Sequence, residues 1–304
     1  MGKYITRRFF EMIITLFLIG TATFFLLGAI PGTAIDKKIQ KLPEATKQVV
    51  IEKYGYDKPI VERYFITLKN YIVNQEFGES IVRAGDTVSS IVKAKMPVSA
   101  RLGIQQILVG VTLGLLLGII AAMNRGKIVD YIILVGAMLF ASVPPLVLSL
   151  LLQKYMAKGA IFNLPIIGWP KGDELLFGGW KYTILPTLAG AGTYLAYYTR
   201  LMKTSMLDSI NEFAIVRKHV FRNSFIPIIT VLPVAISGVI SGSFFIERVF
   251  AIPGAGQYFI QATTDRDVPI LMGLTLLYAA IYIIAIFISD ILYTVVDPRI
   301  RLVK

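Results

Sequence analysis

Cysteine is absent from the 304 residues of this chain, and histidine occurs once, at His219. Without cysteine there is no disulfide framework and no thiolate site. One histidine is too few for an H-E-x-x-H metal site, or for a Ser-His-Asp triad with a second histidine in reserve. We therefore interpret His219 as a solvated or packed side chain of a basic loop and expect no catalytic or metal site.

A phosphate-binding loop of the form G-x-x-x-x-G-K-[ST] is also missing. The nearest pattern, Gly254-Ala255-Gly256-Gln257, lacks the lysine and the strand-to-helix context of such a loop. If ATP drives this protein, the nucleotide and its Mg²⁺ must be bound by another chain. We expect no enzymatic activity and no cofactor in this one.

Charged residues make up only 16% of the chain and hydrophobic residues 55%, which is too apolar for a soluble protein of this length. The apolar residues cluster in six blocks, each close to the roughly 20 residues that cross a hydrocarbon core. The blocks are 9–30, 102–123, 129–152, 182–201, 225–246 and 269–293. Residues 113–120 are apolar on every face, which excludes the alternation of a membrane β-barrel. The sequence predicts an all-α polytopic membrane protein with six transmembrane helices.

None of the six blocks carries a charged residue in its central portion. Inserting such a charge costs about 2.5 to 3.5 kcal/mol, so a transporter keeps one there when it relays protons or binds ions. Its absence argues against a proton-coupled carrier. It permits both a passive or gated channel and a transporter that takes its energy from a partner.

The net charge of +12 is distributed unevenly among the loops. Most basic residues of the short loops lie on the side of the N-terminus: Lys3, Arg7, Arg8, Arg125, Lys127, Arg200, Lys203, Arg217, Lys218, Arg222, Arg299, Arg301 and Lys304. By the positive-inside rule both termini are cytoplasmic, so the charge indicates topology and not nucleic-acid binding. The segment 31–97 is then outside. Within it, 42–54 and 59–73 are predicted as amphipathic helices that cap the mouth of a pathway.

Two features of the predicted spans have more than one interpretation. Pro144-Pro145 lies in the middle of the third span. Proline removes a helical hydrogen bond and kinks the helix there. The kink can be interpreted as a hinge near the pathway or as a packing kink. The second feature is a face of small and hydroxylated side chains in the fifth span, made of Ser237, Gly238, Ser241 and Gly242. That face suits close packing against another helix or the lining of a wet passage.

Short motifs follow one another along the whole chain. They are Ile30-Pro31-Gly32, Tyr54-Gly55-Tyr56-Asp57-Lys58-Pro59, Phe77-Gly78-Glu79-Ser80, Met96-Pro97-Val98-Ser99, Ser142-Val143-Pro144-Pro145, Ile184-Leu185-Pro186-Thr187, Glu247-Arg248-Val249-Phe250-Ala251-Ile252-Pro253-Gly254-Ala255-Gly256 and Asp297-Pro298-Arg299. Each motif alone is weak, but their order and spacing together are specific. In this order the chain resembles the membrane permease subunit of peptide-type ABC importers, the B subunit of oligopeptide and dipeptide permeases.

The resemblance implies the permease fold of type I ABC importers, in which this subunit and a homologous second permease together enclose the passage. Two cytoplasmic ABC ATPase subunits that bind ATP and Mg²⁺ would drive the pair, and an extracytoplasmic peptide-binding protein would deliver the cargo. We expect the passage to be lined by the small face of the fifth span, the kinked third span, and Tyr194 or Tyr197. The residues expected to face the binding protein or to close the outer gate are Phe250, Ile252, Pro253, Gly254, Gly256 and Gln257.

The resemblance also places the contact with the ATPases in the inner loop, at about 203–224. Family members carry a short helix there, with an Ala-rich motif that ends in glycine. Here 207–213 matches the flank before this motif and 215–222 the flank after it, but the middle is missing. The expected contact residues are Leu207, Asp208, Ser209, Ile210, Asn211, Glu212, Phe213 and Ala214. We predict that the native chain contains roughly ten to twenty more residues here, enough for a short docking helix and its turns.

The sequence therefore predicts three parts: the N-terminus with the first span at 1–30, an outer segment at 31–98, and a five-helix core at 99–304. The predicted protein is the transmembrane subunit of an ATP-driven importer of oligopeptides or dipeptides, multi-pass in the plasma (inner) membrane of a bacterium. It would work by alternating access. The alternatives are a gated channel and a permease for another small solute such as nickel.

Overall fold

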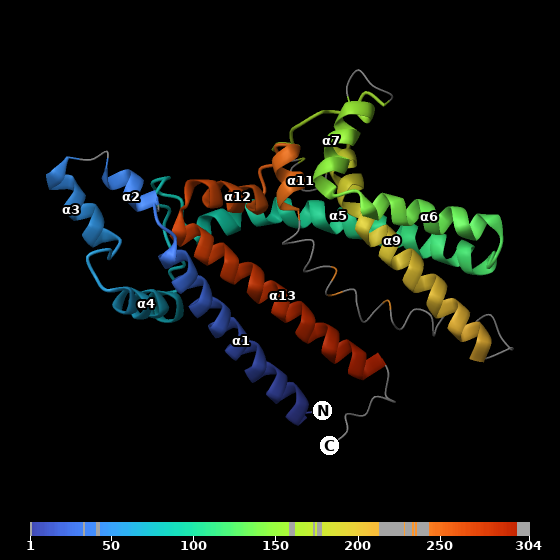
Figure 1. Cartoon of the computed structure of the whole chain (residues 1–304), viewed down its shortest axis with the longest axis horizontal. Helices are drawn as coiled ribbons and strands as arrows, with labels where there is room; N and C mark the ends of the chain where they lie inside the picture. Colours follow the sequence, from blue (N-terminus) through green and yellow to red (C-terminus); the bar gives the residue numbers. More distant parts are fainter. Residues whose placement is uncertain are drawn as a thin grey trace. The chain divides into compact units, whose positions relative to one another are not determined.

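The computed structural model describes residues 2–32, 34–40, 43–157, 162–172, 174, 178–212, 228, 233, 235 and 243–296 (Figure 1). These residues are mostly helical and form no β-strand, only two isolated bridges, Glu79 with Thr87 and Ala157 with Leu164. The helices are α1 (Gly2–Ala29), α2 (Ala34–Ile39), α3 (Glu44–Lys53), α4 (Ile60–Lys69), the π-helix η1 (Asn70–Asn74), α5 (Val88–Met123), α6 (Ile128–Ser142), α7 (Pro145–Met156), α9 (Trp180–Glu212), α11 (Phe244–Val249), α12 (Ala255–Asp265) and α13 (Val268–Val296).

Five of the six predicted spans coincide with described helices. Among the described residues, three helices are long and apolar enough to cross a membrane, namely Ile5–Ala29 of α1, α5, and Val268–Leu292 of α13; the pair α6 and α7 makes a fourth span if taken as one. The predicted span 182–201 lies inside α9. The predicted span 225–246 lies largely outside the described residues, although Ile228, Pro233 and Ala235 are helical.

The third span is broken where Pro144-Pro145 predicted a kink. Helix α6 ends at Ser142 and α7 begins at Pro145, and the two axes differ by 102° (Figure 1). Pro145 occupies the first turn of α7, where its missing N–H is not needed. The hydroxyls of Ser142 and Ser149 donate to the carbonyls of Met138 and Pro145, one turn earlier in the same helix and 2.7 Å away in each case.

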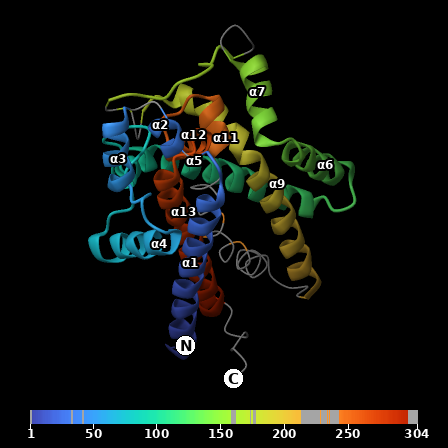
Figure 2. The ribbon, with the colours of Figure 1, turned by 60° about the vertical axis from the view of Figure 1, so that its left-hand side comes forward.

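The chain forms two compact units: a first unit of Met1–Met96 with Gln257–Ile283, and a second unit of Pro97–Gly256 with Ile284–Lys304. In the first unit α1 and the beginning of α13 run side by side, and Gly20 of α1 leaves room for Leu276 of α13 (Figure 2). Helix α4 packs on α1 through Tyr64, whose hydroxyl lies 2.8 Å from that of Thr21. The predicted amphipathic stretches 42–54 and 59–73 hold α3, and α4 with η1.

In the second unit α9 packs along both α6 and α7. One core cluster joins α5, α7, α9 and α11 around Leu102, Leu185, Ile246 and Phe250. A second cluster joins α5 and α9 around Tyr198 and Met202 and includes Ile228 and Ala235 of the predicted fifth span. The three-part division at residues 30 and 98 is one of membrane topology and stays a prediction.

Candidate functional site

Three glycines on α5 let this helix touch the backbone of α9. A Cβ atom on Gly110, Gly114 or Gly118 would lie 2.7, 2.8 or 2.7 Å from the carbonyl oxygens of Ala191, Leu195 and Thr199. Real Cβ atoms essentially never come so close to another atom, so only glycine fits at these three places. The G-x-x-x-G-x-x-x-G spacing is typical of membrane helices whose backbones meet.

The sequence pattern predicted this kind of contact for the fifth span, and the structure shows one on α5. Ser237, Gly238, Ser241 and Gly242 lie outside the described residues, so their role stays a prediction. The stripe at Gly110, Gly114 and Gly118 was visible as three glycines four residues apart in an apolar run. Its partner, α9, could not be read from the spacing.

The two tyrosines proposed for the lining differ in their surroundings. Tyr194 is half-buried, and its hydroxyl donates to the carbonyl of Ala235, 3.4 Å away on the predicted fifth span. The side chain of Tyr197 is 52% exposed, whereas its neighbour Tyr198 is buried against Met202. Pro144 and Pro145 are exposed at the break between α6 and α7. Contact of any of these residues with cargo stays a prediction, and so does the choice between hinge and packing kink.

A buried glutamine links α5 to α9 in the apolar part of the second unit. The Nε2 of Gln106 donates to the carbonyl of Pro186 at 3.1 Å, and the hydroxyl of Ser243 donates to its Oε1 at 3.2 Å. A Cβ on Gly190 would collide with the Gln106 amide, so glycine makes room for it. Gln106 was not among the predicted site residues, although a polar side chain within a predicted span is a signal for an interhelical hydrogen bond.

An ion pair joins the beginning of α6 to the second half of α9. The ammonium of Lys203 lies 2.6 Å from Asp130 Oδ1, and both side chains are largely buried. The second carboxylate oxygen accepts the backbone N–H of Gly126 at 3.1 Å, in the turn that follows α5. Asp130 therefore connects α9 with the α5–α6 turn.

The predicted coupling residues follow this ion pair on the same helix. Leu207 and Asp208 lie in α9, which remains helical through Ser209, Ile210 and Asn211 to Glu212. Phe213 and Ala214 lie outside the described residues. The first part of the predicted inner loop is thus a direct extension of the helix that carries Lys203.

The predicted outer loop is a packed turn between α11 and α12. Phe250 and Ile252 are buried in the core, and the carbonyl of Phe250 accepts the N–H of Gly168 at 2.8 Å. Pro253 and Gln257 are half-buried. In this conformation the Phe250 and Ile252 side chains hold the turn in place. Contact of this turn with a binding protein, or its closing of an outer gate, stays a prediction.

Gly254 and Gly256 let the backbone of this turn approach a buried carboxylate. A Cβ on Gly254 would collide with Glu247 Oε2 and Ser99 Oγ, and one on Gly256 would lie 2.9 Å from the same Glu247 oxygen. The N–H of Ala255, the first residue of α12, donates to Ser99 Oγ at 2.9 Å. Ser99 therefore caps α12. Glycine is needed at positions 254 and 256 of the motif because a Cβ there would collide with these side chains.

Three consecutive charged residues at the turn from α12 to α13 fasten the outer segment to the first unit. The buried carboxylate of Asp267 accepts the hydroxyl of Ser80 and, at 3.2 Å, the N–H of Ile81. Arg266 donates to the carbonyls of Pro31 and Gly32 at 2.6 and 3.0 Å, and Asp265 pairs with Arg83 at 2.9 Å. We call Asp265, Arg266 and Asp267 the corner triad.

The corner triad gives a structural reason for two motifs quoted above. Pro31-Gly32 ends the first span, and Ser80 ends Phe77-Gly78-Glu79-Ser80. Gly78 has φ of +108°, and a Cβ there would lie 3.0 Å from Pro269, so this motif also packs directly on the beginning of α13. The corner triad was not predicted from the sequence, because its partners lie far away along the chain.

Within the part of the chain that the structure describes, no group of three or more His, Asp or Glu residues is placed to hold a metal ion. The buried carboxylates of Asp130 and Asp267 are each held by hydrogen bonds or an ion pair from this same chain. They are therefore structural groups in this conformation.

Comparison with known proteins shows the family of this chain. Residues 114–302 match the family described as binding-protein-dependent transport system inner membrane component, and residues 1–102 match the N-terminal model of such membrane components. The chain belongs to this family. It is therefore a multi-pass membrane subunit of an ABC transporter, a permease with the type I importer fold predicted from the motifs.

The similar proteins cover the permease from end to end. It is 35% identical over 318 residues to the dipeptide transport system permease protein DppB of Bacillus subtilis, covering 100% of this chain and 99% of the relative. It is 34% identical to DppB of Lactococcus lactis, covering 99% and 100%, and 32% identical to the oligopeptide transport system permease protein OppB of Haemophilus influenzae, with the same coverage.

The alignment with DppB of Bacillus subtilis runs over 318 residues, whereas this permease has 304. That relative therefore has positions without a counterpart here. This difference in length supports the prediction of a missing segment between Phe213 and Ala214, and the place of that segment stays a prediction.

The corner triad provides a matched pair of substitutions in the permease. We expect Asp267→Ala to destabilise the first unit by about 3 kcal/mol, because a buried carboxylate is lost together with the hydrogen bonds that Ser80 and Ile81 donate to it. Asp265→Ala removes a partly exposed ion pair and is expected to cost about 1 kcal/mol or less. The thermal midpoint of the purified transporter and the rate at which protease cleaves near residues 77–88 measure the difference. Equal effects of the two substitutions would contradict the proposed importance of Asp267.

Proposed function

We propose that this permease is the transmembrane subunit of an ATP-driven importer for dipeptides or oligopeptides. The observation that carries the proposal is the full-length match to permeases named for dipeptide and oligopeptide transport in several bacteria. The distribution of charge supports it, since no predicted span has a charged side chain at its centre that could relay protons.

The partners in this proposal are a homologous second permease, two cytoplasmic ABC ATPases and an extracytoplasmic peptide-binding protein. ATP and Mg²⁺ bind to the ATPases, since this chain has no phosphate-binding loop. The permease lies in the bacterial plasma (inner) membrane with both termini in the cytoplasm, as the basic loops predict. The outer segment and the rim of the α11–α12 turn then face the binding protein.

Coupling to the ATPases takes place, in this proposal, at the end of α9 and the residues that follow, 207–214. Helix α9 runs unbroken from Trp180 to Glu212, so a push on its cytoplasmic end is carried along the helix. Lys203 and Asp130 pass the same movement to the α5–α6 turn. The passage lies beside the broken third span, Tyr194 or Tyr197, and the small face of the fifth span.

Uptake into vesicles tests the proposed function. We expect proteoliposomes that contain this permease with its partner subunits and binding protein to accumulate a radiolabelled tripeptide only when ATP is supplied on the cytoplasmic side. Replacing the phosphate-loop lysine of the partner ATPases should abolish the accumulation. Flux that follows the gradient regardless of ATP would indicate a gated channel. ATP-driven uptake of nickel without peptide would contradict the peptide cargo.

A further inference from the structure

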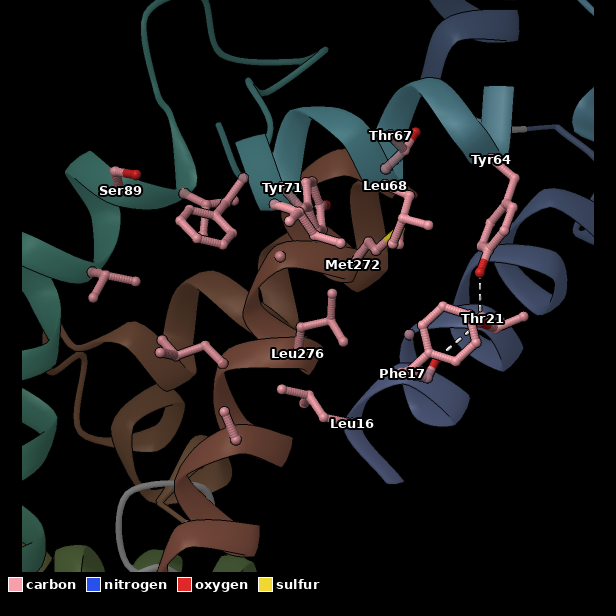
Figure 3. Close-up of a pocket in the computed structure, with 18 of the residues that line it drawn as sticks. Leu16, Phe17, Thr21, Tyr64, Thr67, Leu68, Tyr71, Ser89, Met272 and Leu276 are labelled. Carbon is pink, nitrogen blue, oxygen red and sulfur yellow. Dashed lines mark hydrogen bonds between the residues drawn. The ribbon is translucent and has the colours of Figure 1, made fainter. Parts of the chain in front are cut away.

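The first unit contains a cavity of about 710 Å³ between α1, α4 with η1, the beginning of α5 and α13 (Figure 3). The volume falls in the range of roughly 300 to 1,000 Å³ that is typical of ligand pockets. Leu16, Leu68, Met272 and Leu276 point into the space between the helices (Figure 3). The cavity wall is therefore mostly hydrocarbon.

The hydroxyls in this wall add no charge. Those of Thr21 and Tyr64 lie 2.8 Å apart and bond to each other, and Thr21 also donates to the carbonyl of Phe17 (Figure 3). Burial raises the pKa of Tyr71, on η1, well above its ordinary value, so this side chain stays neutral. A ligand that fills the cavity must itself be apolar.

Two walls of the cavity are helices that span the membrane. On α1 the lining extends from Ile13 to Thr21, which at 1.5 Å per residue lies about 12 to 24 Å from the end of that helix at Ala29. On α13 it extends from Met272 to Ala280, about 6 to 18 Å from the start at Val268. A hydrocarbon core is about 30 Å thick, so the cavity lies at the depth of acyl chains.

Helix α4 and η1 close the cavity with one part of an apolar face and leave the rest uncovered. Tyr64, Leu68 and Tyr71 line the cavity. Val61 and Phe65, on the same face of the helix, are 55% and 62% exposed. An amphipathic helix with such a face, packed on a spanning helix, is suited to the boundary between head groups and acyl chains.

Lys93 is the one charged residue among those that line the cavity, all of which the structure describes. Its side chain is exposed, on the part of α5 that precedes the predicted span. A cation at the end of an apolar cavity that lies nearer the membrane surface complements a phosphate attached to a hydrocarbon chain.

We propose that this cavity holds an acyl chain of a phospholipid, with the lipid phosphate at Lys93. The lipid belongs to the leaflet at which α1 ends and α13 begins, which is the outer leaflet in the orientation proposed above. A helix of the second permease is the alternative occupant, and the labelling experiment below distinguishes the two.

Photolabelling of the assembled transporter tests the proposal independently of its cargo. The probe is phosphatidylglycerol with a diazirine on its acyl chain, in proteoliposomes of phosphatidylethanolamine and phosphatidylglycerol. We expect labelled peptides from α1, α4 with η1, and α13. Ala280→Trp fills the cavity and should reduce this labelling about tenfold, because an indole takes the space of the chain. Ala279→Trp is the matched control, since the neighbouring Ala279 does not line the cavity.

A second pair of variants tests the head group. Lys93→Gln should reduce the labelling about fivefold, as expected for one cation at a membrane surface. Lys95→Gln should leave it unchanged, because Lys95 lies over the ring of Tyr258 and not in the cavity wall. Equal labelling of the Ala280→Trp and Ala279→Trp variants would overturn the proposal. Capture of the second permease, and not lipid, by a photoreactive residue placed at Leu277 would also overturn it.

Discussion

Replacing Gly114 with leucine should prevent the permease from assembling into a transporter. A Cβ at this position would lie 2.8 Å from the carbonyl oxygen of Leu195 and 2.9 Å from the Cβ of Tyr198, before the rest of the leucine is placed. The atom at 2.8 Å belongs to the backbone of α9, so a change of rotamer cannot relieve the clash. The two helices must separate, at a cost of about 3 kcal/mol or more.

The measurement is the yield of assembled complex, together with ATP-dependent uptake for each complex recovered. We expect at least about a tenfold lower yield for Gly114→Leu, the ratio that corresponds to more than roughly 1.4 kcal/mol. Gly136→Leu is the control: Gly136 lies on α6, and a Cβ there meets nothing within 4 Å. Equal yields of assembled complex for Gly114→Leu and Gly136→Leu would contradict the claim that assembly requires the close contact between α5 and α9.

Breaking the ion pair between Lys203 and Asp130 should have the next largest effect. In Lys203→Met the Asp130 carboxylate stays buried next to a methionine side chain, and among the described residues only the Gly126 N–H still donates to it. Removing one partner of a buried pair costs much more than the pair contributes, because the remaining charge has lost its compensation. We expect about a tenfold loss of assembled, transport-competent complex.

The double variant Asp130→Asn with Lys203→Met separates this explanation from a simple loss of packing. It removes both charges, and we expect it to recover most of the yield lost in Lys203→Met. Lys127→Met is the control, since Lys127 is an exposed lysine in the turn between α5 and α6. A double variant as impaired as Lys203→Met would indicate that the charge of Lys203 itself, and not its pairing, is required.

The role proposed for this ion pair in coupling ATP hydrolysis to transport can be measured separately from assembly. If α9 carries the movement of the ATPases to the α5–α6 turn, a double variant that restores assembly should still transport less per ATP hydrolysed than the unchanged protein. The ratio of peptide imported to ATP consumed in proteoliposomes measures this. A ratio equal to that of the unchanged protein would limit Lys203 and Asp130 to a structural role.

The sequence by itself determined the class of protein, the place of five helices and the family. Apolar runs of the length of a bilayer can be helices regardless of their neighbours, because a membrane span satisfies its backbone hydrogen bonds internally. For the same reason 102–123 and 269–293 were found inside α5 and α13, and 9–30 coincides with α1 except for its last residue. The order of short motifs predicted the family that the comparisons establish.

Only the tertiary structure decided which of these features meet. Pro144-Pro145 predicted a kink, but the 102° break between α6 and α7 also depends on the packing of both helices against α9. Gly114 meets Leu195, Asp130 meets Lys203 and Asp267 meets Ser80, each across a long stretch of sequence. The spacing of residue types along the sequence describes one helix at a time. It can therefore single out a glycine or a carboxylate, but it cannot tell which residue of another helix that group contacts. The partner is fixed when the helices pack, because the cost of a steric clash or an unpaired buried charge eliminates the other arrangements.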